Sequence, residues 1–274
     1  MRAEPHSSCS GRSFADNHPR RPPLRRALIT GAASGLAAGI APALARDGFA
    51  RIAITYRNTL PHATLAAIEA AGAQGVAQRL DFLDDAAEVE KILNEMIRAF
   101  GPFDTLVHGV GPLVAKRFAA STLEDYRLAF EGNVRSAVLA ARATLPAMRV
   151  AGFGRVVFFA AHGAANSRSF RGLSFYQAAK SALIVFARTL AIEEAPSGIT
   201  VNLVAPGDIS DKRIDRVEAR KRTALNPRGR AGSYEDVSDA VRFLVAEERD
   251  FITGAVIEVT GGLQTSAERK AQDK

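Results

Sequence analysis

The feature of this sequence that most constrains its fold is a regular alternation of short apolar runs with longer amphipathic stretches. Runs of apolar and β-branched residues recur at 27–30, 51–57, 76–80, 105–108, 155–159, 200–204 and 255–259. Alanine-rich stretches with helical periodicity lie near 35–47, 62–72, 84–100, 122–150, 174–195 and 234–247. Strands that alternate with helices indicate βαβ units and a parallel sheet. The runs are apolar at nearly every position, as is typical of strands that helices cover on both faces.

This pattern predicts a doubly wound α/β Rossmann fold, with a single parallel seven-stranded sheet and helices on both faces. We find no internal repeat and no second composition regime, so residues 27–262 are expected to form one domain. Within it, segment 207–232 lacks a strong period and is interpreted as an excursion after a strand, where open α/β sheets bind ligands. The predicted flanking segments are a disordered basic tail at 1–26 and a polar tail at 263–274.

Composition excludes several classes of protein. Apolar residues make up 47% and charged residues 24% of the 274 residues, which rules out a disordered chain or a coiled coil. No apolar run reaches the roughly 18 residues of a membrane-spanning helix, so we expect no membrane partner. The single cysteine, Cys9, excludes an intramolecular disulfide and a cysteine-built metal site. We therefore expect no metal and a reducing compartment such as the cytoplasm.

The net charge of +7 is concentrated at the N-terminus. Residues 1–26 hold six arginines against Glu4 and Asp16. A solvated extension, or a start assigned too early, is the favoured interpretation. An organelle transit peptide is an alternative, although the segment has acids, four prolines and no clear amphipathic stretch. A nucleic-acid arm is least favoured, because no aromatic residues are interleaved with the arginines, and we expect no nucleic-acid partner.

A glycine-rich turn follows the first apolar run. A dinucleotide site needs glycine there for a tight turn, for close approach of the backbone to the pyrophosphate and for packing of helix on strand. The N-terminus of the following helix supplies free N–H groups and a partial positive charge. Because the turn lies between a first strand and a first helix, it predicts cofactor contacts from Thr30, Gly31, Ser34, Gly35 and Leu36.

The ends of the second and third runs bear on the choice of cofactor. The second run ends without the acid that would bind the ribose hydroxyl of NAD, and Arg57 is placed to meet a 2′-phosphate. NADP(H) is therefore predicted over NAD(H); the alternative is a surface arginine beyond a strand. Asp81 and Phe82 are predicted to lie beside the adenine, and the alternative for Asp81 is a helix N-cap.

Taken in order, these residues resemble the classical short-chain dehydrogenase/reductase superfamily over about residues 27–262. The motifs that carry the resemblance are Thr30-Gly31-x-x-x-Gly35-x-Ala37, Asp81, Asn133, Tyr176-x-x-x-Lys180, Asn202 to Pro206-Gly207, and Arg228-x-Arg-x-Gly232. The last third of the chain is most similar to 3-oxoacyl-[acyl-carrier-protein] reductases.

The resemblance implies an NADP(H)-dependent oxidoreductase that moves a hydride between nicotinamide and a carbonyl or secondary alcohol, with a 3-oxoacyl thioester as a candidate substrate. It implies that Tyr176, Lys180 and Asn133 are catalytic. Lys180 lies one helical turn from Tyr176, so its ammonium is expected to lower the pKa of that phenol. Asn133 is expected to hold a water that relays protons to the lysine. Further cofactor contacts are expected from Tyr176, Lys180, Gly109, Gly111, Pro206, Gly207 and Ile209.

Two departures from the family pattern stand out. The sequence His108-Gly-Val-Gly111 replaces Asn-Asn-Ala-Gly, which is expected to loosen the support of the central sheet. The position of the active-site serine aligns with Ala161, which has no hydroxyl. Three outcomes stay open: a substitute donor from the following stretch, a role for His162, or a slow enzyme whose chemistry is different or lost. The substitute donors considered are Asn166, Ser167, Ser169 and Ser174. The alternative function is a degenerate NADP(H)-binding protein that acts as a sensor or scaffold.

The excursion 207–232 also bears on partners. It carries eight basic against four acidic residues, a rim that would steer an acidic acyl-carrier protein or a coenzyme A thioester. A solvated helix of mixed charge explains the same residues. The phenylalanines considered as an apolar lining, or as plain core, are Phe118, Phe130, Phe170 and Phe175. The family implies a homodimer or homotetramer built through the helices near 122–150 and 174–195, where alanine faces would permit close packing: Ala137, Ala140, Ala141, Ala178, Ala179 and Ala182.

Overall fold

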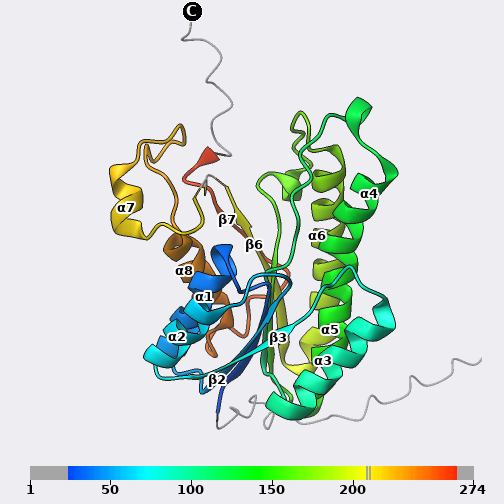
Figure 1. Cartoon of the computed structure of the whole chain (residues 1–274), viewed down its shortest axis with the longest axis vertical. Coiled ribbons are helices and arrows are strands. Elements are labelled where there is room, and N and C mark those ends of the chain that lie inside the picture. The colour runs from blue at the N-terminus through cyan, green and yellow to red at the C-terminus, as the bar shows by residue number, and fades with distance from the viewer. Residues whose placement is uncertain (1–23, 208, 210, 264–274) are drawn as a thin grey trace, which may run out of the picture.

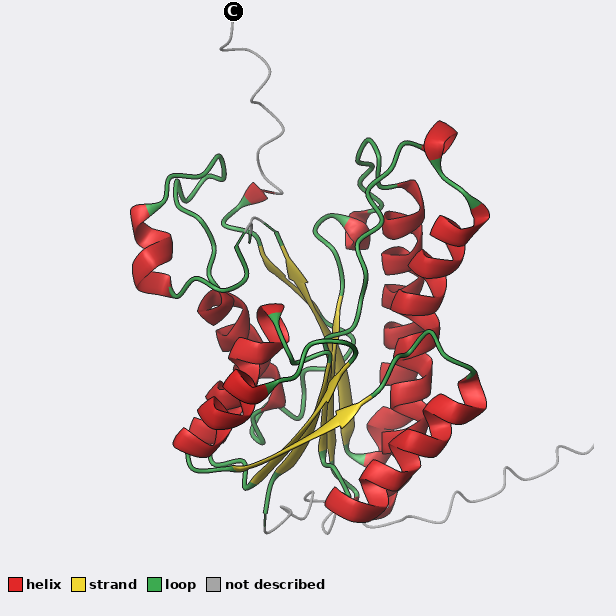
Figure 2. Ribbon diagram, in the orientation of Figure 1, coloured by secondary structure: helices red, strands yellow, loops and turns green. Residues whose placement is uncertain are grey.

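The sheet of this protein has seven parallel strands, as the sequence predicts. The computed structural model describes residues 24–207, 209 and 211–263. In space the strands run in the order β3-β2-β1-β4-β5-β6-β7, and every neighbouring pair is parallel (Figure 2). Their bounds are β1 Arg26–Thr30, β2 Arg51–Tyr56, β3 Gln74–Arg79, β4 Thr105–His108, β5 Gly154–Phe159, β6 Ile199–Pro206 and β7 Val256–Val259.

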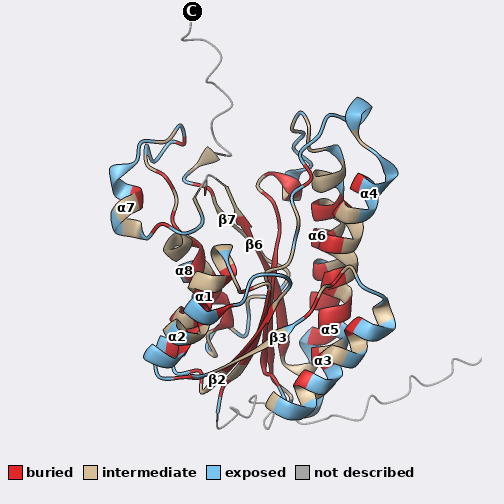
Figure 3. Cartoon of the chain, viewed as in Figure 1, coloured by how far each residue is buried: buried red, intermediate tan, exposed pale blue. Residues whose placement is uncertain are grey.

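Helices cover both faces of this sheet. Figure 1 shows α1, α2 and α8 on one face and α3, α5 and α6 on the other. One apolar core lies under each helical layer, and the strands are mostly buried while the outer helix faces are exposed (Figure 3). The helix bounds are α1 Gly35–Arg46, α2 His62–Ala70, α3 Ala86–Phe100, α4 Leu123–Phe130, α5 Ser136–Ala151, α6 Ser174–Glu194, α7 Arg216–Lys221 and α8 Tyr234–Val245, with one-turn helices at Phe118–Ala120, Ala164–Asn166 and Ala195–Ser197.

The strand order reverses between β1 and β4, and this reversal positions the functional site. Leu28 of β1 lies opposite Ala53 of β2 on one side and Leu106 of β4 on the other. The chain leaves β1 toward α1 on one face, and it leaves β4 toward α4 and α5 on the opposite face. Connections that diverge in this way leave a crevice at the carboxyl ends of the strands.

The continuous helix predicted for 122–150 is interrupted in the structure. A π-helical turn at Glu131–Arg135 separates α4 from α5. Inside it, Ser136 Oγ donates to the carbonyl of Gly132 at 2.7 Å, and the Asn133 amide donates to a carbonyl one turn earlier at 2.8 Å. The alanine-rich pattern is helical on both sides, so it does not reveal the extra residue that a π turn inserts.

The described structure already includes positioned residues before the predicted boundary at residue 26. Arg25 is buried, and its guanidinium donates to Asp104 Oδ1 at 3.0 Å and to Thr105 Oγ1 at 2.7 Å. Arg26 opens β1, and its backbone N–H donates to Asp104 Oδ2 at 2.7 Å. Charge alone groups both arginines with the tail, although each pairs with a buried acid. The rest of the predicted N-terminal tail, residues 1–23, and residues 264–274 lie outside the described residues.

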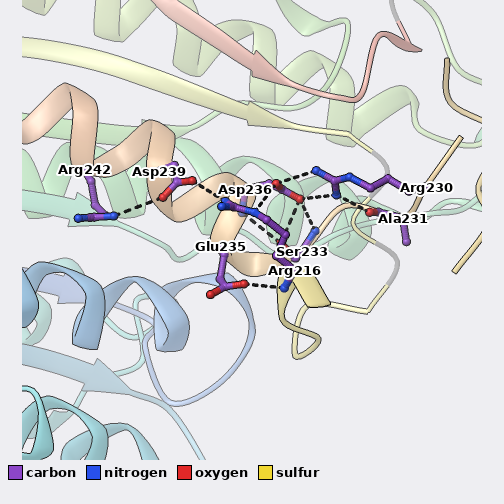
Figure 4. Close-up of polar contacts among 8 residues, drawn as sticks. All are labelled: Arg216, Arg230, Ala231, Ser233, Glu235, Asp236, Asp239 and Arg242. Carbon is purple, nitrogen blue, oxygen red and sulfur yellow. Dashed lines mark hydrogen bonds and ion pairs between the residues drawn. The ribbon is translucent and has the colours of Figure 1, made fainter. Parts of the chain in front are cut away.

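Ion pairs fasten the 207–232 excursion to α8. Arg230 donates to both carboxylate oxygens of Asp236, at 2.9 and 2.8 Å. Arg216, at the start of α7, contacts Asp236 and Asp239 (Figure 4). Burial would raise the pKa of Asp236, but the hydrogen bonds that it accepts outweigh burial and lower the pKa. These ion pairs therefore hold the excursion in place beside the carboxyl ends of the strands.

Candidate active site

A cavity of about 510 Å³ opens at the carboxyl ends of β1, β4, β5 and β6. It occupies the crevice that the reversal of strand order creates, where open α/β sheets bind ligands. Motifs from both halves of the sequence meet there. The predicted site residues that line it are Gly31, Ser34, Gly35, Leu36, Gly109, Gly111, Tyr176, Lys180, Pro206, Gly207 and Ile209.

The turn between β1 and α1 needs glycine for its backbone conformation. Gly31 has φ +68° and Gly35 has φ +67°, both in the left-handed region. The N–H of Gly31 donates to Thr55 Oγ1 at 3.1 Å, which fixes the turn to the end of β2. α1 has no acidic residue in its first turn, and the side chain of its cap residue Ser34 makes no capping bond. The N-terminus of α1 therefore offers N–H groups and a positive dipole end to an anionic group.

The end of β4 is better supported than the sequence predicts. His108 is buried, with Nδ1 2.8 Å from Thr30 Oγ1 and Nε2 3.0 Å from Ser136 Oγ. Burial, followed by the charge of Lys180, lowers the pKa of His108 to about 3, so the ring is neutral. The expected loosening is wrong, because one imidazole links β1, β4 and α5. Thr30, predicted to contact the cofactor, is fully buried, and its hydroxyl also accepts from the N–H of Gly109 at 3.1 Å.

Gly111 lets the loop after β4 pass close to two predicted catalytic groups. A Cβ at Gly111 would lie 2.7 Å from Asn133 Oδ1 and 2.8 Å from Lys180 Nζ. Asn133 is fully buried, and its Nδ2 donates to the carbonyls of Ala129 at 2.8 Å and Pro112 at 3.1 Å. Its Oδ1 accepts no hydrogen bond from the described residues. Because an unpaired buried acceptor is costly, this oxygen fits one that serves a bound water or ligand.

Tyr176 and Lys180 lie one turn apart on α6. Lys180 is 2% exposed, and its Nζ donates to the carbonyl of Phe159 at 2.6 Å and lies 5.7 Å from the centroid of the Tyr176 ring. Burial, followed by the charge of Lys212, lowers the pKa of Lys180 to about 7. Burial raises the pKa of Tyr176. The expected lowering is therefore wrong for the chain by itself, because burial of the phenol raises its pKa.

The loop after β5 brings an imidazole, but no hydroxyl, to the cavity. Ala161 and His162 both line it. The loop is held in place by Gln177, whose Nε2 donates to the carbonyl of His162 at 3.1 Å, and it turns at Gly163 with φ +75°. The side chains considered as substitute donors are exposed and do not line the cavity: Asn166, Ser167, Ser169 and Ser174.

Arg57 lies outside the cavity lining but near the cofactor turn. It is exposed, directly after β2 and two residues beyond Thr55, whose hydroxyl and carbonyl accept from the N–H groups of Gly31 and Ala32. No ion pair joins Arg57 to another described residue. Its guanidinium is therefore available at the edge of the turn.

Asp81 and Phe82 also lie outside the cavity lining. Asp81 Oδ1 accepts from the N–H of Leu83 at 3.0 Å, a local turn after β3. The alternative role as a helix N-cap is wrong, because Asp85 caps α3 by accepting from the N–H of Ala87 at 2.9 Å. Phe82 is buried. The acid that caps the helix is four residues further on than the one that the sequence pattern singled out.

Of the phenylalanines considered as an apolar lining, Phe170 lines the cavity. The other three belong to a separate aromatic cluster around Tyr126. The ring of Phe175 lies 5.6 Å from that of Tyr126 and 5.9 Å from that of Phe118, between ring centroids. Phe130 lies 4.6 Å from Tyr126. These three rings pack beside the site rather than in it.

The alanines proposed to form close contacts between subunits are partly used within the chain. Four of them are at most 2% exposed and pack inside: Ala137, Ala140, Ala141 and Ala179. Ala178 is exposed and Ala182 is half-buried. The small side chains of α5 thus serve close packing inside the chain, which weakens their predicted role between subunits.

The basic rim is largely neutralised within the described residues. Five of its eight basic side chains form ion pairs with acids of the excursion or of α8: Arg213, Arg216, Lys221, Arg222 and Arg230. The interpretation as a solvated helix of mixed charge accounts for these five. Lys212 instead lines the cavity, and its Cδ lies 3.7 Å from the position of a Cβ at Gly35.

Sequence reasoning missed three polar residues at or beside the cavity. Lys212 was counted with the basic rim. It follows β6, whose carboxyl end borders the same cavity as the Gly31–Gly35 turn. Gln177 follows Tyr176 directly and fixes the loop that bears His162. Glu258, on β7, lies beside His162 across the sheet edge. No local pattern marks Glu258, because only the pairing of β7 with β6 brings it there.

Three comparisons with known proteins agree with this geometry. A family model described as Enoyl-(Acyl carrier protein) reductase matches residues 31–264. YtkK of Bacillus subtilis (strain 168) is 33% identical over 250 residues, covering 88% of this chain and 96% of the relative. The 3-oxoacyl-[acyl-carrier-protein] reductase FabG of Escherichia coli (strain K12) is 32% identical over 240 residues, covering 86% of this chain and 96% of the relative. The chain belongs to the short-chain dehydrogenase/reductase family.

Solved structures of this family share the fold. The crystal structure of acetoin dehydrogenase from Enterobacter cloacae superposes with a TM-score of 0.80 at 25% sequence identity, covering 92% of this chain and 98% of that one. The protein is thus an oxidoreductase of the short-chain dehydrogenase/reductase family with its Rossmann fold. In the part of the chain that the structure describes, no cluster of three or more His, Cys, Asp or Glu residues could hold a metal ion. Nor is any described helix long and apolar enough to cross a membrane.

Proposed function

We propose that this oxidoreductase reduces a carbonyl group with NADPH, that Tyr176 protonates the carbonyl oxygen, and that 3-oxoacyl thioesters are the substrate class. One observation carries the proposal: the Gly31–Gly35 turn and the Tyr176–Lys180 pair border the same cavity of about 510 Å³. The 3-oxoacyl-[acyl-carrier-protein] reductase relative supports the substrate class. The partners that we propose are acyl-carrier protein and a second copy of the chain, in a homodimer or homotetramer.

The residues present fit a nicotinamide dinucleotide. The N-terminus of α1 suits a pyrophosphate, and Arg57 at the edge of the turn suits a 2′-phosphate. Glycine keeps the crevice open: a Cβ at Gly109 would lie 2.6 Å from the carbonyl oxygen of Thr30, and one at Gly207 would lie 2.9 Å from Thr260. When bound, the reduced nicotinamide would supply the hydride.

The side chains of α6 suit the proton transfer that accompanies hydride transfer. Negative charge develops on the carbonyl oxygen, so a positioned acid must donate to it. The raised pKa of Tyr176 keeps the phenol protonated and ready to donate. Lys180, with its pKa lowered to about 7, can release and regain a proton near neutral pH. A water on Asn133 Oδ1, close to Lys180 Nζ, would reload the lysine.

Ala161 carries the argument for the alternative function. We propose that it stands where relatives have the active-site serine, so that one donor to the substrate oxygen is absent. Loss of one such donor typically costs about 10²–10³ in rate. A degenerate protein that binds NADP(H) as a sensor or scaffold would tolerate that loss.

NADPH oxidation by the purified protein separates the two functions. We expect turnover with 3-oxoacyl thioesters, presented on coenzyme A and on acyl-carrier protein, and loss of turnover in Lys180→Ala. Binding of NADPH, followed by its fluorescence, should persist in the variant. Absence of oxidation with thioesters, quinones, diketones and ketosteroids, together with intact NADPH binding, would favour the binding protein and contradict the reductase.

A further inference from the structure

Charge that develops on a carbonyl oxygen is stabilised best by more than one donor, and the cavity offers few. Its polar side chains are Ser34, His162, Tyr176, Gln177, Lys180 and Lys212. Ser34 and Lys212 border the Gly31–Gly35 turn. Lys180 donates to the carbonyl of Phe159, and the Gln177 amide donates to the backbone of the β5 loop. Besides Tyr176, His162 is the polar side chain that the loop after β5 brings to the cavity wall, next to Ala161.

A buried carboxylate lies behind the His162 ring. Nδ1 of His162 is 3.6 Å from Oε2 of Glu258. Neither that nitrogen nor either oxygen of Glu258 has a hydrogen-bond partner among the described residues, and all three atoms are buried. Glu258 is held on β7, where it pairs with Ala205 of β6. A carboxylate at this distance attracts the Nδ1–H edge of the imidazole, so Glu258 fixes the orientation of the ring.

We propose that Glu258 orients the His162 ring, and that Nε2–H of His162 donates the second hydrogen bond to the substrate carbonyl oxygen. This inference rests on the proposed reductase function. The carbonyl carbon receives the hydride from the reduced nicotinamide, which becomes oxidised. The π pair of the C=O bond moves to oxygen, and that oxygen takes the proton of Tyr176. His162 keeps its proton and contributes a hydrogen bond, and Glu258 is a positioning residue.

The groups that face the ring permit this arrangement. On its own loop, Arg168 Nη1 donates toward Nε2 at 3.5 Å in the ligand-free chain, so the exposed Arg168 side chain must move aside before Nε2–H can donate to a substrate oxygen. Phe170, 5.5 Å away between ring centroids, packs on the imidazole and lines the same cavity. From β7 comes Glu258, and from α6 come Tyr176 and Lys180 across the cavity. The only carboxylate among these groups is therefore the one behind Nδ1.

Substitution of the pair should reduce catalysis without weakening cofactor binding. His162→Gln is expected to lower kcat by about 10²–10³, the usual effect of removing one donor, with the Kd of NADPH unchanged. Glu258→Gln is expected to lower kcat in the same direction, and Glu258→Asp to recover part of it. Matched controls are His62→Gln and Glu69→Gln, exposed residues of α2 that do not line the cavity and should behave as wild type.

A rescue experiment separates a donor role from a structural one. Ala161→Ser adds a hydroxyl beside His162, and it should restore much of the kcat lost in His162→Gln. Melting temperatures establish that each variant is folded. If Glu258→Gln does not fold, the kcat of Glu258→Asp is compared with wild type in its place. If His162→Gln retains wild-type kcat while Lys180→Ala abolishes turnover, the His162–Glu258 inference is overturned and the reductase stands. If the wild-type protein oxidises no NADPH, both fall.

Discussion

Two histidines, His108 and His162, lie at or just beyond the carboxyl ends of the neighbouring strands β4 and β5, and their surroundings differ. His108 is the last residue of β4, and both of its ring nitrogens are hydrogen-bonded, to Thr30 and Ser136. His162 lies three residues beyond the end of β5, and its Nδ1 has no hydrogen bond but faces Glu258 at 3.6 Å. The fold therefore provides hydrogen bonds for both nitrogens of His108, whereas His162 lies at the cavity wall with the carboxylate of Glu258 beside it.

This difference separates polar side chains that stabilise the fold from polar side chains that are available for the reaction. Buried polar groups in native proteins are nearly always hydrogen-bonded, and the exceptions call for an explanation. His108 follows this rule, so we expect its replacement to lower the free energy of unfolding. Three exceptions lie at or near the cavity: His162 lines it, Asn133 Oδ1 lies next to Gly111 of its wall, and Glu258 lies behind His162. We expect their loss to reduce catalysis.

The largest expected difference is in the free energy of unfolding. His108→Ala leaves two buried hydroxyls without their partner and opens a cavity, so it should lose about 2–4 kcal/mol. His162→Ala should lose less than His108→Ala, because His162 Nδ1 makes no hydrogen bond with the described residues. Urea denaturation of both variants at neutral pH measures the two values. Equal losses, or a larger loss for His162→Ala, would contradict the claim that His108 stabilises the fold more than His162 does.

A second effect, smaller for each pH unit, should appear on acidification. The folded chain keeps His108 neutral down to a pKa of about 3, whereas the unfolded chain takes up the proton near 6.5. The unfolded state thus binds more protons in this window, and stability should fall as pH drops from 6.5 toward 3, by at most about 1.4 kcal/mol per unit. The measurement is the difference between wild type and His108→Asn, because carboxylates titrate in both. A constant difference over this range would show that His108 is not held neutral.

The smallest effect extends the comparison to the cofactor end of the cavity. Arg57 is an exposed, unpaired cation, so Arg57→Ala should leave stability within about 0.5 kcal/mol of wild type. It should raise the KM for NADPH about tenfold, equivalent to about 1.4 kcal/mol, and change the KM for NADH little. Arg98→Ala, an exposed arginine in the last turn of α3, is the control. Equal changes for the two cofactors would remove Arg57 from phosphate recognition.

The order of strands and helices could be predicted from the sequence because each element carries its own periodicity. Apolar runs without alternation mark buried parallel strands, and the glycine turn after the first run marks the cofactor end. The π turn at Glu131–Arg135 was hidden because a one-residue insertion leaves the alanine pattern on both sides intact. The early start of the fold was hidden because Arg25 looks like its basic neighbours until Asp104 is placed beside it.

The site was predictable where its residues lie close together in the sequence. Tyr176 and Lys180 share one helix face, and the structure places both on the cavity wall. The direction of the Tyr176 pKa shift was mispredicted, because burial is a property of the whole fold that spacing does not carry. The His162–Glu258 contact joins residues from different strands and could not be read from either segment.

Single-turnover reduction of a 3-oxoacyl thioester by protein preloaded with NADPH tests the central claim most directly, with wild type and Tyr176→Phe compared. We predict that both bind NADPH with similar Kd, and that wild type oxidises one equivalent of it upon mixing. Tyr176→Phe should react about 10²–10⁴ times more slowly, because the phenol that donates the proton is gone. Equal rates in the two proteins would contradict the account.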